Sequence, residues 1–221
     1  MTWDWAYALS ILPSLLAGLG TTVKATMGGI VIALPLGLII AVLRSRRIPV
    51  VAQLCTLFVH FIRGTPLLVQ AFTAYFLLPS AGLTLDPLQT GIAVIGINYS
   101  AYTAEVYRAG IEDVPVGQWE ACAALSLPGR ATWFRIILPQ AVRSVIPALG
   151  NYWIQMFKDV AILSTITMSE LLHTAETFGT SDFKYLEPLT LAGVLYFLVS
   201  YPAAVLIRRM ERRFVFTRTR R

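Results

Sequence analysis

The sequence predicts an all-α integral membrane protein with five transmembrane helices in a single domain, and three observations lead to this fold class. Hydrophobic residues make up 56% of the 221-residue chain and charged residues only 14%, with a mean hydropathy of +0.66. A soluble domain of this size keeps roughly a quarter of its residues charged. The apolar segments are long and continuous, which favours helices over the short alternating strands of a barrel. Basic residues gather beside these segments, as they do at membrane flanks.

Five segments contain the ~20 mostly apolar residues that a spanning helix needs. The predicted spans cover about 20–43, 50–78, 88–110, 141–163 and 187–208. Residues 9–19 are expected to form a short interfacial helix that leads into the first span, because Pro13 and Gly18 interrupt the apolar run. Gly28, Gly29 and Gly37 predict close helix packing in the first span.

The distribution of Lys and Arg predicts the orientation. Seven of the eighteen basic residues lie in the last fourteen positions, three lie between the first two spans, and three lie at the loop before the fourth span. The opposite side has six carboxylates against Lys184 alone. Basic loops stay in the cytoplasm, so we expect a periplasmic N-terminus and a cytoplasmic C-terminus. Membrane lipid is therefore the expected surrounding of this basic chain, and nucleic acid is excluded as a partner.

One sizeable polar loop, about 112–140, lies on the predicted cytoplasmic side. We expect a short helix over about 118–127, a break at Pro128–Gly129, and a second short helix over about 130–138 that ends at Pro139. The candidates for the apolar side of the first helix are Trp119, Cys122, Ala123 and Leu125. Such a helical pair suits docking by another protein, and an amphipathic loop lying on the membrane is the alternative.

The loop carries a resemblance to a known family. Its residues match, at the same spacing, the EAA loop of ABC-importer permeases: Glu120, Ala121, Cys122, Ser126, Ile136, Leu138 and Pro139. Cys122 replaces an alanine of that pattern and Ser126 replaces its glycine. Ser126 argues against a left-handed backbone there, so Gly129 is expected to supply the turn. The resemblance implies a coupling helix that binds a separate ATP-binding subunit.

Further blocks resemble the polar amino-acid branch of these permeases, namely RGTPLLVQ, YTAEVYRAGI, LPQAVRSVIPALGNY and FKDVAILSTIT. The start MTWDWAYALSILPSLL and the block KYLEPLTLAG most resemble the permeases for ectoine and hydroxyectoine. The resemblance implies a multi-pass subunit of the bacterial cytoplasmic (inner) membrane. It also implies an external substrate-binding protein and a second permease subunit, either an identical copy or a sister chain.

Catalysis by this chain is not expected. The sequence has no Gly-Lys-Ser or Gly-Lys-Thr, so the phosphate-binding loop of an ATPase is missing, and ATP and Mg²⁺ are expected on a partner subunit. His60 and His173 are far apart in sequence and do not suggest a metal site, and no cofactor is expected. The alternative function is an ion-coupled secondary carrier or a channel subunit, which would not need the cytoplasmic loop.

Polar residues at membrane depth are candidates for a substrate path, because such residues usually face a partner or a water-filled cavity. Arg63 is followed by Gly64-Thr65-Pro66, where we expect a broken helix. Arg63 is interpreted either as the ligand of a substrate carboxylate or as an ion-pair partner of Glu105 or of a neighbouring subunit. The complete set of candidates is Arg63, Thr65, Gln70, Tyr102, Glu105, Asn151 and Gln155.

Three further charged residues lie in the predicted spans. Glu105 shares a helix face with Tyr102 and is a candidate for binding the cationic end of a zwitterion. Lys158 and Asp159, at the outer end of the fourth span, are expected to pair locally. Five helices are too few to enclose a small zwitterion, which again predicts a dimer of permease subunits.

Overall fold

The structure is a computed structural model that describes residues 3–45 and 48–215. The described residues form helices and no strand. In chain order the elements are α1 (Trp5–Ser45), α2 (Pro49–Gly64), α3 (Leu67–Phe72), the π-helix η1 (Thr73–Leu77), the 3-10 helix η2 (Leu78–Ala81), α4 (Pro87–Glu112), α5 (Val116–Ala124), α6 (Gly129–Ala131), the π-helix η3 (Thr132–Ile137), α7 (Leu138–Asp159), the 3-10 helix η4 (Val160–Ile166), α8 (Leu171–Ser181) and α9 (Leu186–Val215).

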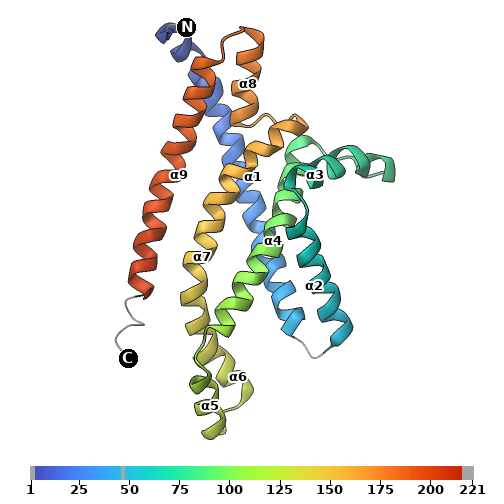
Figure 1. Ribbon diagram of the computed structural model, residues 1–221, viewed down its shortest axis with the longest axis vertical. Helices are drawn as coiled ribbons and strands as arrows, with labels where there is room; N and C mark the ends of the chain where they lie inside the picture. The colour runs from blue at the N-terminus through green and yellow to red at the C-terminus, as the bar shows by residue number, and fades with distance from the viewer. Residues whose placement is uncertain (1–2, 46–47, 216–221) are drawn as a thin grey trace.

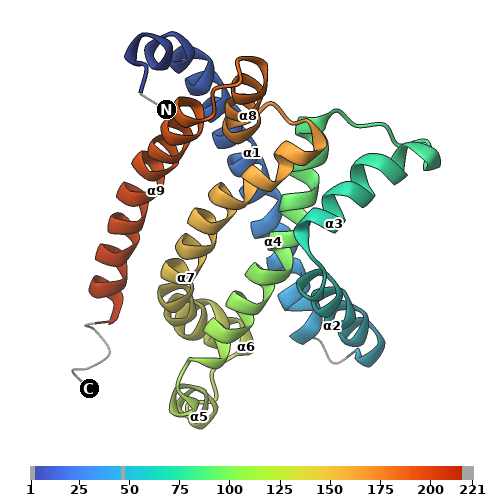
Figure 2. The ribbon, with the colours of Figure 1, turned by 45° about the horizontal axis from the view of Figure 1, so that its top comes forward.

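The long helices run together along one axis. Figures 1 and 2 show α1, α4 and α7 side by side, with α2 on one side of this group and α9 on the other. The most extensive contact joins α1 to α4. The short helices α5 and α6 extend beyond the end opposite the N-terminus, and α8 lies at the N-terminal end (Figure 1).

Small residues allow α1 and α4 to approach closely, as predicted for the glycines of the first span. An ideal Cβ built on Gly29 would lie 2.7 Å from Cγ2 of Ile95. One built on Gly37 would overlap Oγ1 of Thr103. Neither position has room for a methyl group, so the prediction of close packing is confirmed.

The prediction of a short interfacial helix over residues 9–19 is wrong, because α1 is one continuous helix of 41 residues. Pro13 removes one backbone hydrogen bond from the helix. On either side of it, Ile11 and Leu15 are almost fully buried against α8 and α9, which stabilises the helical path. Gly18 contacts α8 directly, since a Cβ there would lie 2.7 Å from Oγ1 of Thr174. Tertiary packing therefore overrides the local helix-breaking signals.

The third predicted span matches α4 to within two residues at each end. Asp86 caps its N-terminus by accepting a hydrogen bond from the backbone N–H of Gln89 at 2.8 Å, and the side chain of Gln89 accepts one in return from the N–H of Asp86. Such a reciprocal capping box satisfies donors that have no partner inside the helix. It sets the position at which the helix begins.

Two of the described helices, α1 and α9, are long and apolar enough to cross a membrane. The described residues contain a third candidate span if α2 and the segment from Leu67 to Ala81 are counted as one. These two pieces are bent by 104°. The expected break after Arg63 is therefore confirmed, and the single span over 50–78 is replaced by a sharply turned pair. α4 and α7 do not qualify by the same criteria, and each carries polar side chains, some of which line the cavity described below.

The second half of the polar loop differs from the prediction. No helix ends at Pro139, since the π-helix η3 continues directly into α7. Pro139 is the second residue of α7 and follows directly on η3, so it lies inside a continuous helical path. Proline has no backbone N–H to donate, and π-helical turns replace the regular α-helical pattern just before it. The fourth span is thereby extended downward to the loop.

Candidate functional site

A cavity of about 440 Å³ opens at the break between α2 and α3. It also lies against α4 and the upper half of α7, so residues of α2, α3, α4 and α7 contribute to its wall. The lining residues are Arg63, Gly64, Thr65, Pro66, Leu67, Asn98, Tyr99, Tyr102, Tyr152, Gln155 and Asp159. Of the predicted path residues, Arg63, Thr65, Tyr102 and Gln155 line this cavity.

The break itself is stabilised by one side-chain amide. Thr65 and Pro66 adopt extended backbone conformations, which removes two residues from the helical hydrogen-bond pattern. Gln70 donates from Nε2 to the backbone oxygen of Ile62 at 2.9 Å and to that of Thr65 at 3.2 Å. Its Oε1 accepts a hydrogen bond of 3.0 Å from Nδ2 of Asn98 on α4. Gln70, predicted as a path residue, therefore lies behind the wall and fixes the shape of the break.

Three tyrosines form the aromatic part of the wall. The ring of Tyr102 lies 5.7 Å from that of Tyr99 and 5.5 Å from that of Tyr152, measured between centroids. The guanidinium carbon of Arg63 lies 5.2 Å from the centroid of Tyr102, a cation–π contact. Asn98 and Tyr99 were missed by the sequence prediction. Tyr99 precedes Tyr102 by three residues on the same helix, and this spacing places both on one face.

The cavity has one positive and one negative side chain that no described ion pair neutralises. Arg63 forms no salt bridge with any described residue. Asp159 accepts a hydrogen bond of 2.8 Å from the hydroxyl of Tyr99. The predicted local pair of Lys158 with Asp159 is wrong, because the ion pairs of the described residues do not include it and Lys158 is exposed. Asp159 faces the cavity instead.

Glu105 is held by other charges. It pairs with Arg44 of α1, and its second carboxylate oxygen lies 2.9 Å from Nη2 of Arg108. The pair with Arg63 considered from the sequence is not formed, and Glu105 does not line the cavity. Sequence reasoning placed Arg44 in a loop, whereas it lies in the last turn of α1 and faces α4. This network joins the lower parts of the two helices.

Asn151 also has a partner outside the cavity. Its Nδ2 donates a hydrogen bond of 3.0 Å to Glu211 of α9. Asn151 precedes Gln155 by four residues, but only Gln155 lines the cavity. This hydrogen bond joins α7 to the lower part of α9. Asn151 therefore forms a contact between helices and does not line the cavity.

The polar loop presents α5 at the lower end of the molecule (Figure 1). Trp119 packs edge to face against Trp133 with centroids 5.3 Å apart, and Cys122 is buried. Ala123 is exposed and Leu125 is 72% exposed, so the prediction that these two belong to the inner apolar side is wrong. Glu120 is exposed. The remaining candidates for coupling, Ala121, Gly129, Leu138 and Pro139, are exposed and Ile136 is half-buried.

Ser126 adopts the left-handed backbone that the sequence argued against, with a φ of +49°. The backbone N–H of Ser126 bonds to the oxygen of Ala123, and that of Leu127 bonds to the oxygen of Cys122, both at 3.0 Å. These two bonds form the Schellman motif that closes a helix C-terminus. The motif fixes the backbone locally, and serine accepts the conformation despite its Cβ. Gly129 instead begins α6.

Replacing Ser126 with glycine should stabilise the protein by about 1 kcal/mol, because glycine adopts this backbone without a steric cost. The melting temperature of the purified chain in detergent is expected to rise by about 2–4 °C. Ser144→Gly, in the helical part of α7, is the matched control and should lower it, since glycine is the poorer helix former. Equal losses for both variants would contradict the assignment of strain to Ser126.

Comparison with known proteins defines the class. Residues 33–216 match the family of binding-protein-dependent transport system inner membrane components, and the chain belongs to this family. It is 45% identical, over 95% of its length and 93% of the relative's, to a probable amino-acid ABC transporter permease protein of Sinorhizobium fredii. It is 35% identical, over 95% of its length and 92% of the relative's, to an L-cystine transport system permease protein of Bacillus subtilis.

Solved structures share the fold. The crystal structure of an amino acid ABC transporter with histidines has a chain 34% identical to this one, with a TM-score of 0.92 over 96% of this chain and 100% of that chain. A methionine ABC transporter in an inward-facing conformation has a TM-score of 0.66 at 19% identity, over 94% of this chain and 99% of that one, and supports the fold alone. The arrangement of helices is therefore that of ABC permeases.

Proposed function

We propose that the chain is the permease subunit of an ABC importer for a small zwitterion of the amino-acid class. The observation that carries this proposal is the cavity, whose two charges of opposite sign have no ion-pair partner among the described residues. Its volume of about 440 Å³ lies in the range of small-molecule sites. The names of the amino-acid permeases that resemble the chain support the substrate class.

In this proposal Arg63 binds the carboxylate of the solute and Asp159 binds its ammonium group. Planar guanidinium groups suit carboxylates because they donate two parallel hydrogen bonds. The tyrosine rings and Gln155 add hydrogen-bonding groups and faces that attract a cation. Asp159 thus takes the role that the sequence suggested for Glu105. Ectoine and hydroxyectoine, which the sequence resemblance suggested, stay a prediction.

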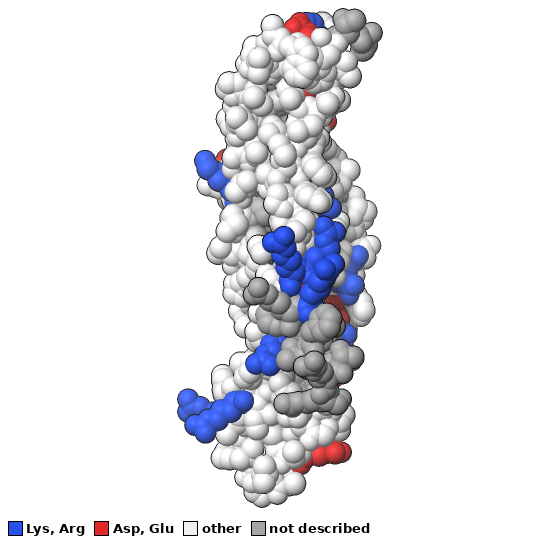
Figure 3. All heavy atoms as spheres, turned by 90° about the vertical axis from the view of Figure 1, so that its left-hand side faces the viewer, with Lys and Arg blue, Asp and Glu red and all other residues white. Residues whose placement is uncertain are grey.

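The chain is proposed to cross the bacterial inner membrane five times, with the N-terminus in the periplasm. The crossing elements would be α1, the bent pair after Pro49, α4, α7 and α9. The distribution of charge supports this orientation: on the α9 face, Lys and Arg side chains gather around the lower half of the molecule (Figure 3). Two permease subunits, identical or sister chains, are proposed to form the complete path, and a substrate-binding protein is proposed to deliver the solute from outside.

The energy would come from a separate ATP-binding subunit that holds ATP and Mg²⁺ and docks on α5. Val116 and Glu120 are four residues apart on one face of α5, and both are exposed. The inner face is filled by Trp119 and Cys122, so the outward face is available to a partner. The alternative, an ion-coupled carrier, is not favoured, because the arginines of α1 and α4 already pair with Glu105.

Glu120→Lys should reduce binding of the ATP-binding subunit about tenfold or more, because the substitution reverses a charge on the proposed docking face. The measurement is co-purification of the chain with its ATP-binding subunit, followed by ATP-dependent uptake in proteoliposomes. Glu176→Lys is the matched control for the co-purification alone, since Glu176 is an exposed carboxylate on α8 at the end opposite α5. Full ATPase binding and coupled uptake by Glu120→Lys would refute the docking proposal.

A further inference from the structure

The turn between α8 and α9 holds one aromatic side chain outward at the N-terminal end of the molecule. Phe183 is 86% exposed, the highest value for any large hydrophobic side chain among the described residues. Its φ is +53°, a conformation that bulky side chains rarely adopt. Phe183 directly follows Asp182, the C-cap of α8, at a position where glycine is usual. An exposed ring and a strained backbone therefore coincide at one residue.

The residues on either side of Phe183 are tied to the N-terminal segment. The hydroxyl of Tyr7 donates a hydrogen bond of 2.7 Å to Oδ2 of Asp182. Nζ of Lys184 lies 3.0 Å from Oδ2 of Asp4 and 4.7 Å from the centroid of the Tyr7 ring. The backbone N–H of Tyr7 and the Lys184 ammonium lower the pKa of Asp4, so this carboxylate is charged at neutral pH.

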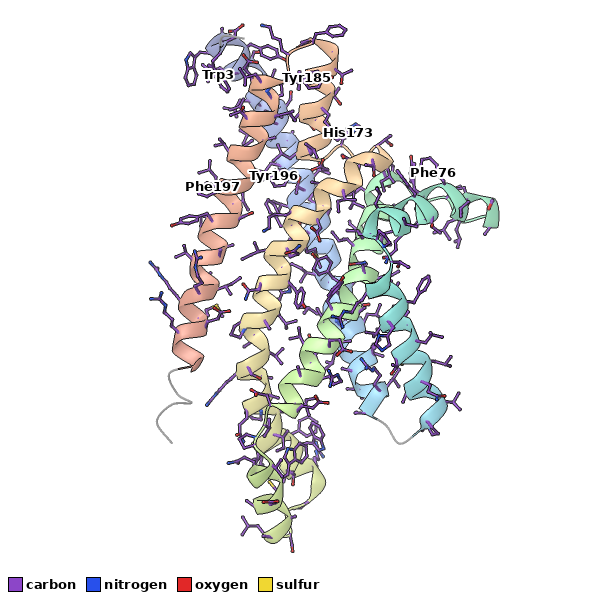
Figure 4. The ribbon with its side chains drawn as sticks, in the orientation of Figure 1. Trp3, Phe76, His173, Tyr185, Tyr196 and Phe197 are labelled. Atoms are coloured by element: carbon purple, nitrogen blue, oxygen red, sulfur yellow. The ribbon has the colours of Figure 1, made fainter. Side chains whose placement is uncertain are left out.

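Tyr185 fixes the other end of the turn. A Cβ built on Gly179 would lie 2.5 Å from Cδ1 of Tyr185, so the ring rests directly on the α8 backbone. The Tyr185 hydroxyl lies 3.3 Å from Oγ1 of Thr180. Figure 4 shows Tyr185 at the same end of the molecule as Trp3. The turn is held on both sides, and Phe183 is kept away from the body of the protein.

Few of the described residues contact the ring of Phe183, and its backbone has a strained, positive φ. Strain of this kind persists where the surrounding structure imposes it, and it is concentrated at binding sites. An aromatic side chain presented on a rigid turn is the usual anchor of a protein–protein interface, because little conformational freedom is lost on binding.

We propose that Phe183 is the anchor by which this chain docks the external substrate-binding protein, an inference that rests on the proposed function. The partner would present an apolar pocket with a basic rim. Within residues 3–10 and 171–190 the carboxylates that reach the surface are Asp4, Glu176 and Asp182, against the single ammonium group of Lys184, so the charge here is complementary to such a rim. Anionic lipid headgroups are the poorer fit, because the same carboxylates repel them.

The test compares Phe183→Gly with the wild-type chain, each assembled with its ATPase subunit in lipid nanodiscs. The variant should bind the substrate-binding protein of the transporter at least tenfold more weakly and lose the stimulation of ATP hydrolysis by that protein. Its melting temperature should nevertheless rise by about 2–4 °C, because glycine relieves the positive φ. Phe183→Trp should retain binding. Phe197→Ala, which removes a 60% exposed ring from the regular helix α9, is the matched control.

Two results would overturn the inference and leave the proposed function standing. One is an equal affinity of wild type and Phe183→Gly for the binding protein. The other is measured by the tryptophan fluorescence that Phe183→Trp adds to that of the wild-type chain. If brominated lipids quench this added fluorescence and the binding protein does not change it, residue 183 contacts the membrane. A wild-type chain that does not respond to the binding protein at all would instead refute the proposed function, and this inference with it.

Discussion

Replacing Arg63 with glutamine is expected to reduce ATP-driven uptake about a hundredfold. Among the described residues, Arg63 is the only cationic side chain in the cavity wall. If it binds the solute carboxylate, its removal leaves that charge desolvated and unpaired, which costs about 2–5 kcal/mol, or a factor of tens to thousands in affinity. The measurement is uptake of labelled solute by proteoliposomes that contain the assembled transporter, with the binding protein supplied outside.

Two controls make this result specific. Lys24→Gln removes an exposed cation from α1 and should leave uptake unchanged. Arg63→Lys keeps the charge and loses the paired donors, so uptake should fall less than in Arg63→Gln. The labelled solute is the one that the binding protein selects from ectoine, arginine, glutamine and histidine. Selection of an amino acid over ectoine would contradict the ectoine prediction, and normal uptake by Arg63→Gln would contradict the assignment of Arg63.

Gly37→Ala is expected to lower the free energy of unfolding by about 3 kcal/mol. The added methyl group would overlap Oγ1 of Thr103 and lie 2.9 Å from the backbone oxygen of Ser100. Thr103 also donates a hydrogen bond of 2.9 Å to the backbone oxygen of Ala33. The methyl group would push the Thr103 hydroxyl away and break this hydrogen bond. Overpacking of a tight contact typically costs about 1–3 kcal/mol, and the lost hydrogen bond adds about 1 kcal/mol.

The matched control for Gly37 is on the same helix. Gly20 has no atom within 4 Å of an ideal Cβ, so Gly20→Ala should stabilise α1 by about 1 kcal/mol through helix propensity alone. Thermal unfolding in detergent separates the two, with an expected fall of about 6–12 °C for Gly37→Ala and a small rise for Gly20→Ala. A similar melting temperature for both variants would show that α1 and α4 can separate at little cost.

The sequence predicted features that depend on local chemistry. The start of α4 was predicted from the point where the apolar run begins, and the break after Arg63 from a proline that removes a backbone donor. Both signals are contained in a few neighbouring residues. The charged and aromatic residues of the wall were partly found for the same reason, since polar residues stand out in an apolar segment.

The errors concern features that depend on distant contacts. Glu105 and Asp159 are both carboxylates in predicted spans, and the sequence alone does not show that Arg44 reaches the first while Tyr99 reaches the second. The left-handed backbone of Ser126 follows from the Schellman motif around it and not from the intrinsic preference of serine. In each case the partners supplied by the fold decide between alternatives that the residue type leaves open.

The amide of Gln70 has a consequence for the energetics of transport. Its Nε2 donates hydrogen bonds to the backbone oxygens of Ile62 and Thr65, so the carbonyl groups left free by the break are satisfied in the folded protein without a bound solute. The charge of Arg63 is thus preorganised beside a wall that needs no further ordering. In the proposed function, little conformational entropy would therefore be lost when the solute binds, so a modest set of contacts would suffice for binding.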